Sequence, residues 1–511
     1  MPLPRSYYWA AFTAALLSGG ASPLAADVTL PAILSSHMVV QRDQPIHLWG
    51  WAAPDENVAV DFNHVQRSAT ADKLGRWDIV LPPQSAGGPY ALTIKGANTI
   101  RLEDILVGDV WFASGQSNME MPLAGFPNSA VVTNSAEEIQ NANQPNLRLL
   151  LIYKKASEFP LRDYEPVSWT ACTPETAAKF SAVAYFFGKQ LAGSEHVPIG
   201  LIDSTWGGTP AEAWTSMAGL SADSSLMPVF AAWSGFSGER AETARLIEAE
   251  KAADEAARKA NQPLPKHPWR PDPVSWEPAA LFNAMVAPAL NFHIKGAIWY
   301  QGESNASVER ANLYEKLFPA LIADWRARWH EGDFPFLFVQ IANFKAGSQV
   351  TWPVVREAQR RTLSLANTAM AVTIDIGDPE NVHPADKQDV GGRLALAARK
   401  LAYGEDVEFS GPAYREVAIE GNNLRVWFDH VAGGLMAKGD ALKGFEVAGD
   451  DHHFMHAAAR IEGNSVLVSC DAVPNPKFVR YGWANAPVVN LFNGKGLPAS
   501  PFTSEEQIPR L

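Results

Sequence analysis

Short apolar runs that end in small-residue turns dominate the middle of the chain. Examples are ILVGDVWFASG, VPIGLIDSTWGG and IKGAIWYQG, and helical stretches such as 176–191 and 313–328 separate such runs. Strands that are apolar throughout are buried on both faces, which is typical of a parallel sheet covered by helices on both sides. The sequence therefore predicts an α/β domain over residues 106–404, with ligands bound beyond the carboxyl ends of its strands.

Alternating apolar and polar runs flank this region on both sides. Runs such as GRWDIVLPP, broken by Gly, Pro and Asp-Glu-Asn turns, predict an N-terminal β-sandwich over residues 27–105. Similar runs with turns at IEGNN and IEGNS predict a C-terminal β-region over residues 405–511. A charged, proline-broken segment near 215–276 predicts a helical insertion in the α/β domain.

Residues 1–26 differ from everything that follows. Arg5 precedes an apolar run from Tyr7 to Leu17, and Ala25 and Ala26 close the segment. This order is typical of a signal peptide and predicts export, to the periplasm or the medium. No later segment is apolar over the roughly 18 residues that a membrane span needs. We expect no membrane contact after signal removal.

The overall charge excludes one class of partner. The net charge is -13 and no run of Lys or Arg occurs, so the chain lacks the electrostatic attraction that nucleic-acid binding requires. The two cysteines, Cys172 and Cys470, cannot form a disulfide framework. The sequence favours two separate buried thiols over a single bridge.

Two segments at predicted strand ends hold a serine and a histidine. Ser117 follows an apolar strand in a turn opened by Gly115, and a serine nucleophile needs such exposure and a neighbouring base. His383 follows another strand, with Glu380 three residues and Asp378 five residues before it. A carboxylate there can accept from Nδ1–H while Nε2 takes the serine proton. An ordinary turn and a helix N-terminus explain the same residues without catalysis.

Two other strand ends offer hydrogen-bond donors. In DSTWGGTPAEAW, Gly207 or Gly208 can present a backbone N–H to a developing negative charge, and in WYQGESNA, Gln301 or Asn305 can present a side-chain amide. Each motif alone is explained by turn and cap residues. Together, the four segments predict a single site for acyl transfer.

The four segments resemble the ordered blocks of a known superfamily. GQSNMEM, DSTWGGTPAEAW, WYQGESNA and GDPENVHPADK are similar to the blocks of SGNH hydrolases, specifically of sialate O-acetylesterase-like carbohydrate esterases. SSHMVVQRDQPIHLWGWA and RYGWANAPVVNLFNGKGLPASPF resemble their flanking β-regions, so the likeness covers nearly the whole chain after residue 26. The resemblance implies a flavodoxin-like domain and a serine esterase that hydrolyses acetyl esters on glycans, with no cofactor and no metal.

The resemblance also implies roles for individual residues. Ser117 is the nucleophile and His383 the base, and the N–H groups of Ser117 and Gly207 stabilise the oxyanion, with Gly208 as the alternative. Gln301 is the third donor, with Asn305 as its alternative. It replaces the superfamily's usual asparagine, because Ser304 stands two residues after Gly302 in this chain.

The acid that orients the histidine is left open. The superfamily usually has Asp three residues before the histidine, where this chain has Glu380. Glu380 or Asp378 can orient the ring, or Ser117 and His383 can act as a dyad. The spacing favours Glu380.

Two tryptophans and one histidine-rich segment are further candidates for ligand contacts. Trp206 and Trp299 stand beside two of the motifs, and we expect them to line the cleft as platforms for sugar rings. DDHHFMH (450–456) lies away from every motif, and neighbouring strand residues point to opposite faces, so we expect no metal there.

The expected partner is an acetylated oligo- or polysaccharide. The sequence does not separate a plant hemicellulose such as xylan or xyloglucan from sialic acid. The alternative functions are a lipase or thioesterase on the same scaffold and a glycan-binding protein without catalysis.

Overall fold

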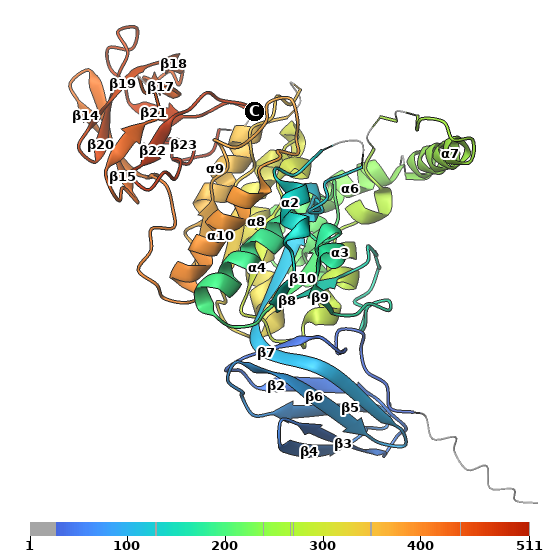
Figure 1. Ribbon diagram of the computed structural model, residues 1–511. Helices are drawn as coiled ribbons and strands as arrows, with labels where there is room; N and C mark the ends of the chain where they lie inside the picture. Colours follow the sequence, from blue (N-terminus) through green and yellow to red (C-terminus); the bar gives the residue numbers. More distant parts are fainter. Residues whose placement is uncertain are drawn as a thin grey trace, which may run out of the picture.

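The computed structural model describes residues 27–509 except 128, 129, 239, 266, 269, 348, 349 and 440. The predicted signal peptide, residues 1–26, lies outside the described residues. Figure 1 shows an N-terminal β-region below a central α/β part, and a C-terminal β-region beside that central part.

A mostly parallel sheet forms the centre of the molecule. Its strand order is β13-β12-β11-β7-β10-β8-β9, and only the β8–β9 pair on this path is antiparallel. The strands are β7 (Thr99–Gly115), β8 (Gln144–Leu151), β9 (Thr170–Cys172), β10 (Ile199–Thr205), β11 (Gly296–Tyr300), β12 (Phe336–Val339) and β13 (Thr368–Ala371). When the five strands from β10 to β13 are numbered by their order along the chain, they stand in the sheet as 2-1-3-4-5, which is the flavodoxin-like order. The predicted fold class is confirmed.

Helices cover both faces of this sheet, because its strands are apolar on both. Trp111 and Ala113 of β7 pack in one core with α4 (Ala182–Glu195) and α10 (Lys387–Leu401). Phe112, which points the other way, packs in a second core with α8 (Val308–Trp329) and α9 (Trp352–Thr362). The short helices α2 (Ser135–Gln140) and α3 (Pro174–Ala178) lie on the α4 side in Figure 1.

The N-terminal β-region shares a strand with the central sheet. Strands β1 (Val39–Gln41) and β6 (Gly87–Lys95) pair with β7, and β6 also pairs with β3 (Asn57–Phe62), which pairs with β4 (Val65–Thr70). A separate ladder joins β2 (Ile46–Trp51) to β5 (Arg76–Leu81). The domain boundary that we predict at residue 105 therefore falls inside β7.

The C-terminal β-region has a hydrophobic core of its own. One sheet has the order β14-β15-β20-β19 and another the order β18-β17-β21-β23, and β16 pairs with β22. The strands are β14 (Ala413–Glu420), β15 (Asn423–Asp429), β16 (Leu435–Ala437), β17 (Phe445–Ala448), β18 (Met455–His456), β19 (Ala458–Glu462), β20 (Ser465–Ser469), β21 (Phe478–Tyr481), β22 (Leu491–Asn493) and β23 (Phe502–Thr503).

The segment near 215–276 holds the helices α5 (Met217–Ser221), α6 (Pro228–Gly238) and α7 (Arg240–Lys259). Figure 1 shows α7 projecting away from the central part, and exposed ion pairs such as Glu242–Arg245 lie along it. None of the helices in the described part of the chain is both long and apolar enough to cross a bilayer. Cys172 and Cys470 are free thiols, so the prediction that they form no bridge is confirmed. Cys172 is buried as predicted, whereas Cys470 is only half-buried.

Candidate active site

The four predicted motifs meet at the carboxyl edge of the central sheet. Ser117 begins the short helix α1 (Ser117–Glu120) directly after β7, and Gly207 follows β10. Gln301 follows β11, and His383 lies in the loop between β13 and α10. Because β10, β7 and β11 are adjacent parallel strands, their ends place these loops side by side.

The turn before Ser117 is held from the neighbouring strand end. Gly115 has a φ of +136°, and a Cβ there would lie 2.2 Å from the Tyr300 carbonyl oxygen. The Gln116 N–H donates to that oxygen at 3.0 Å, and the buried Gln116 Oε1 accepts from the Ser304 N–H at 3.1 Å. Ser117 itself is half-buried, and its N–H, at the first position of α1, has no intrahelical acceptor.

The segment of His383 is tied to that of Ser117 through their neighbours. Asn118 Nδ2 donates to the Val382 carbonyl oxygen at 3.0 Å. The His383 ring packs edge-on against Phe126, with centroids 5.3 Å apart. No direct hydrogen bond joins the Ser117 hydroxyl to the ring; such bonds are often long until substrate binds.

The surroundings keep the His383 ring neutral. Burial lowers its pKa to about 4, and the positive charge of Lys387 acts in the same direction. At neutral pH the ring is therefore in the form that accepts a proton from a serine hydroxyl.

A buried polar network lies beneath these two residues. Asn118 Nδ2 also donates to Glu303 Oε1 at 2.6 Å, and Lys387 Nζ donates to Asn118 Oδ1 at 2.6 Å. Glu303 Oε2 is buried without a hydrogen-bond partner in the described part of the chain. Burial raises the pKa of Glu303 and lowers the pKa of Lys387 to about 7.

Sequence reasoning missed this network. Glu303 and Lys387 stand inside WYQGESNA and GDPENVHPADK, so an ionisable residue within each motif was the signal available. The network joins the loops that carry Ser117 and His383.

Neither candidate acid contacts the histidine ring. Glu380 is exposed and pairs with Lys345 Nζ at 2.5 Å, while Asp378 Oδ1 accepts from the Glu380 N–H at 2.9 Å. Over the residues that the structure describes, the His383 ring has no carboxylate partner, and its backbone N–H donates to Asn381 Oδ1 at 3.0 Å. Of the three possibilities left open by the sequence, this geometry favours the dyad.

The glycine turn after β10 packs directly on Ser117. A Cβ on Gly207 would lie 3.1 Å from Ser117 Cβ. The Gly207 N–H donates to Glu120 Oε2, and Glu120 Oε1 pairs with Lys154 at 2.6 Å. Gly208 has a φ of +73°, and its N–H donates to no residue that the structure describes.

The prediction of Gln301 as an oxyanion donor is wrong for this structure. Its side chain is fully buried, and Nε2 gives its two hydrogens to Thr209 O at 3.2 Å and Asn305 Oδ1 at 2.7 Å. Asn305, its alternative, is also buried and donates to Glu212 Oε2 at 2.8 Å. These amides join the loop after β11 to the loop after β10.

The two predicted sugar platforms differ. Trp299 is fully buried in the core, with its ring against Trp214, Phe318 and Trp325, so that prediction is wrong. Trp206 is half-buried directly after β10, and its N–H donates to Gly115 O at 3.1 Å. Its role in the cleft stays a prediction.

Two of the three histidines of 450–456 have acidic partners of their own. His452 Nδ1 lies 2.8 Å from Glu505 Oε1, and His456 Nδ1 lies 3.4 Å from Glu446 Oε1. Among the described residues, no three His, Cys, Asp or Glu side chains gather closely enough to hold a metal ion.

Known proteins resemble this chain over most of its length. The family model described as carbohydrate esterase, sialic acid-specific acetylesterase, matches residues 268–400. Sialate O-acetylesterase of Rattus norvegicus is 31% identical over 526 residues, which cover 92% of this chain and 93% of the relative. That of Homo sapiens is 32% identical over 76% of this chain and 73% of its own length.

A solved structure agrees with these relatives. The crystal structure of a carbohydrate acetylesterase from Xanthomonas citri has a TM-score of 0.81 and 38% identity, covering 94% of this chain and all of that one. Sequence and fold therefore lead to the same conclusion: the chain belongs to the sialate O-acetylesterase family of carbohydrate esterases and hydrolyses acetyl esters on glycans.

Proposed function

We propose that the hydrolysis proceeds through an acetyl-enzyme on Ser117. His383 takes the hydroxyl proton as the oxygen attacks the acetyl carbonyl, and it returns the proton to the sugar oxygen as the ester bond breaks. Water then attacks the acetyl-enzyme by the same route and releases acetate. The observation that carries this proposal is the Asn118–Val382 hydrogen bond, which holds the loop of a neutral His383 beside the turn of Ser117.

The dyad is the simplest arrangement for this site. With Glu380 paired to Lys345, the ring depends on its packing against Phe126 and on the turn at Asn381 for its position. Both Glu380 and Asp378 then act at most through the charge that they add to the loop.

Backbone N–H groups are the best candidates for the oxyanion site. The N–H of Ser117 has no acceptor inside α1, and that of Gly208 has none among the described residues. Gly207 is the weaker candidate, because its N–H already donates to Glu120. A developing oxyanion there would have to displace this carboxylate.

The proposed substrate class is an acetylated glycan, and the vertebrate relatives named sialate O-acetylesterase make O-acetylated sialic acid one member of it. Acetate release from O-acetylated sialic acid, acetylated xylan and acetylated xyloglucan would rank the substrates. Mapping a serine-directed phosphonate by mass spectrometry tests the chemistry. Label on Ser117 supports the proposal, and label on another serine with loss of activity would move the site.

We also propose that residues 1–26 direct export. The order of Arg5, the apolar run and the closing Ala25-Ala26 supports this. The intact mass of the protein recovered from the periplasm or medium of an expressing bacterium tests it, because removal of the signal shortens the chain by about this segment.

A further inference from the structure

A cleft lies far from Ser117, at the opposite end of strand β7. Its volume is about 790 Å³, and it opens between the N-terminal β-region and two loops of the central part. Strand β7 leads from that β-region to Gly115, and its part from Leu106 to Gly115 is roughly 30 Å long. Ser117, just beyond Gly115, therefore lies about this far from the N-terminal β-region. The cleft therefore belongs to a separate surface and not to the esterase site.

Two tryptophans stand on the outer face of the β2–β5 ladder. Side chains two residues apart on a strand share a face, so Trp49 and Trp51 lie together. Their partners across the ladder are Asp78 and Arg76, which are exposed. The opposite face, with Leu48, is buried in the core. Aromatic side chains thus occupy the face of the ladder that also carries charges.

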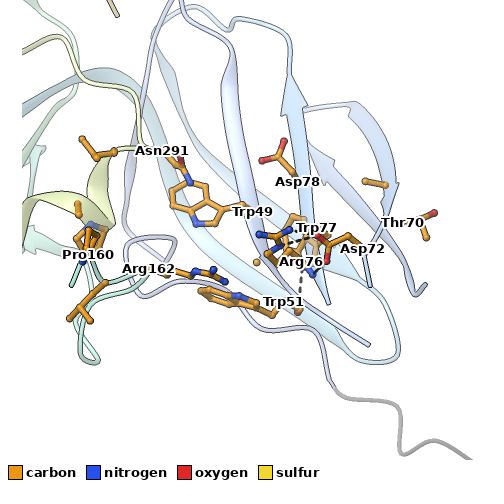
Figure 2. A pocket seen from close by; sticks show the side chains of 16 residues that line it. Trp49, Trp51, Thr70, Asp72, Arg76, Trp77, Asp78, Pro160, Arg162 and Asn291 are labelled. Carbon is orange, nitrogen blue, oxygen red and sulfur yellow. Dashed lines mark hydrogen bonds and ion pairs between the residues drawn. The ribbon is translucent and has the colours of Figure 1, made fainter. Parts of the chain in front are cut away.

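The central part supplies the facing wall of the cleft. This wall comprises Pro160–Arg162 and residues of the stretch 287–291. Figure 2 shows Arg162 reaching from its loop toward the Trp51 indole, with Asn291 near Trp49. Arg162 is exposed and forms no ion pair or hydrogen bond with the residues that the structure describes. Its guanidinium is free to donate to a ligand.

The charges of the cleft cancel. Its lining has two carboxylates, Asp72 and Asp78, and two guanidiniums, Arg76 and Arg162. Asp72 and Arg76 pair at 2.6 Å, and Asp78 pairs with His47. Because the formal charges of the lining sum to zero, a highly charged polymer of either sign gains no net attraction to the cleft as a whole. A neutral ligand with flat apolar faces and many hydroxyl groups fits, because indoles cover such faces and the Arg162 guanidinium and Asn291 amide can hydrogen-bond to hydroxyls.

We propose that this cleft binds a neutral segment of a glycan chain, with Trp51 as the stacking platform and Arg162 as a hydrogen-bond donor. Trp51 is half-buried and Trp49 almost fully buried, so Trp51 offers the ring face and Trp49 supports it. The site would hold a polysaccharide while acetyl esters elsewhere on it reach Ser117. Binding of a glycan at this cleft does not depend on the chemistry proposed for Ser117.

Affinity electrophoresis of the full chain in gels with soluble, unacetylated polysaccharides tests this. The probes are xyloglucan, glucomannan and xylan as neutral polymers, and polygalacturonate as an acidic one. Trp51→Ala and Arg162→Ala should each weaken retention by a neutral polymer, Trp51→Ala by roughly two- to tenfold in Kd. Both should hydrolyse p-nitrophenyl acetate like the unchanged protein. Trp427→Ala, a half-buried tryptophan of the C-terminal β-region, is the matched control and should leave retention unchanged.

The outcomes are distinct. Selective weakening by the two cleft variants supports the site. No retention by any neutral polymer, retention by polygalacturonate alone, or equal retention by the unchanged protein and Arg162→Ala would overturn it. Because Arg162 is exposed and has no polar partner among the described residues, Arg162→Ala gives an answer even where Trp51→Ala does not fold. Failure of the Ser117 mechanism would appear instead as unchanged ester hydrolysis in Ser117→Ala.

Discussion

The carboxyl end of β7, near Ser117, and the cleft of the N-terminal β-region differ in whether their charged groups are buried or exposed. Near Ser117, the polar groups of Asn118 and Lys387 are buried and bonded to each other, and burial shifts the pKa values of Lys387 and His383. In the cleft, the charges are exposed and the apolar groups form the walls. Electrostatic interactions are stronger away from water, so the first arrangement suits catalysis and the second suits contact with a ligand.

Ser117, the proposed nucleophile, gives the sharpest test of this division. Ser117→Ala should lower kcat for acetyl esters by about 10⁴- to 10⁶-fold, because binding and oxyanion stabilisation alone remain. Polysaccharide retention should not change. Kinetics and affinity electrophoresis of the same preparation check both, with the exposed Ser221→Ala as control. Near-normal turnover by Ser117→Ala would refute the assignment.

The buried network is expected to position the two groups that we propose as catalytic, Ser117 and His383. Glu303→Gln keeps the shape of the side chain but replaces the carboxyl group that accepts from Asn118 by an amide, which cannot ionise. We expect kcat to fall by about 10²-fold with little change in KM, since a small displacement of the reacting groups is costly. Glu309→Gln, on the exposed side of α8, is the control. Activity within twofold of normal would show that the network has no positioning role.

The pH dependence should reveal the buried environment of His383. The rate kcat/KM falls when the base is protonated, and a pKa lowered to about 4 keeps the ring neutral to lower pH than an ordinary histidine. The acid limb should therefore lie well below about 6.5. Lys387→Met removes a positive charge and should move the limb upward, whereas Lys251→Met on α7 should not. A limb near 6.5 in the unchanged protein would contradict this environment.

The two acids beside the histidine should have small effects. Glu380→Gln and Asp378→Asn should each cost less than about tenfold in kcat, because neither carboxylate contacts the ring. An orienting carboxylate in a triad contributes about 10⁴-fold. A loss of that size in one variant alone would identify the partner of His383 and replace the dyad by a triad.

Chelation should have the smallest effect of all. EDTA is expected to leave the rate unchanged, since the serine route uses side chains and backbone N–H groups only. Loss of activity that added zinc restores would call for a metal in the mechanism and would direct attention to His452 and its neighbours.

The central sheet could be predicted because its strands carry their own signal. Apolar runs such as 110–113 can be buried only between two layers of helices, and the small residues after each run mark the strand ends. Since parallel strands end at one edge, Ser117 and the glycines after β10 could be placed together without knowing a single contact.

The side-chain roles could not be predicted in the same way. Trp299 and Tyr300 alternate between two cores on a strand that is buried on both faces, and the sequence shows only that both are aromatic. Gln301 finds its acceptors 92 positions away at Thr209 and 4 positions away at Asn305, and Asn118 meets Lys387 across 269 positions. Whether an amide is free or fully bonded depends on such distant partners.

The continuity of β7 has a consequence for how the protein unfolds. One strand of 17 residues carries hydrogen bonds to β6 and β1 in the N-terminal region and to β10 and β11 in the central sheet. If either region unfolds, β7 loses hydrogen-bonded neighbours in that region, and an unpaired sheet edge becomes exposed. Heat should therefore disrupt both in a single calorimetric transition, and a protein shortened to begin at residue 106 should aggregate instead of surviving as an independent esterase.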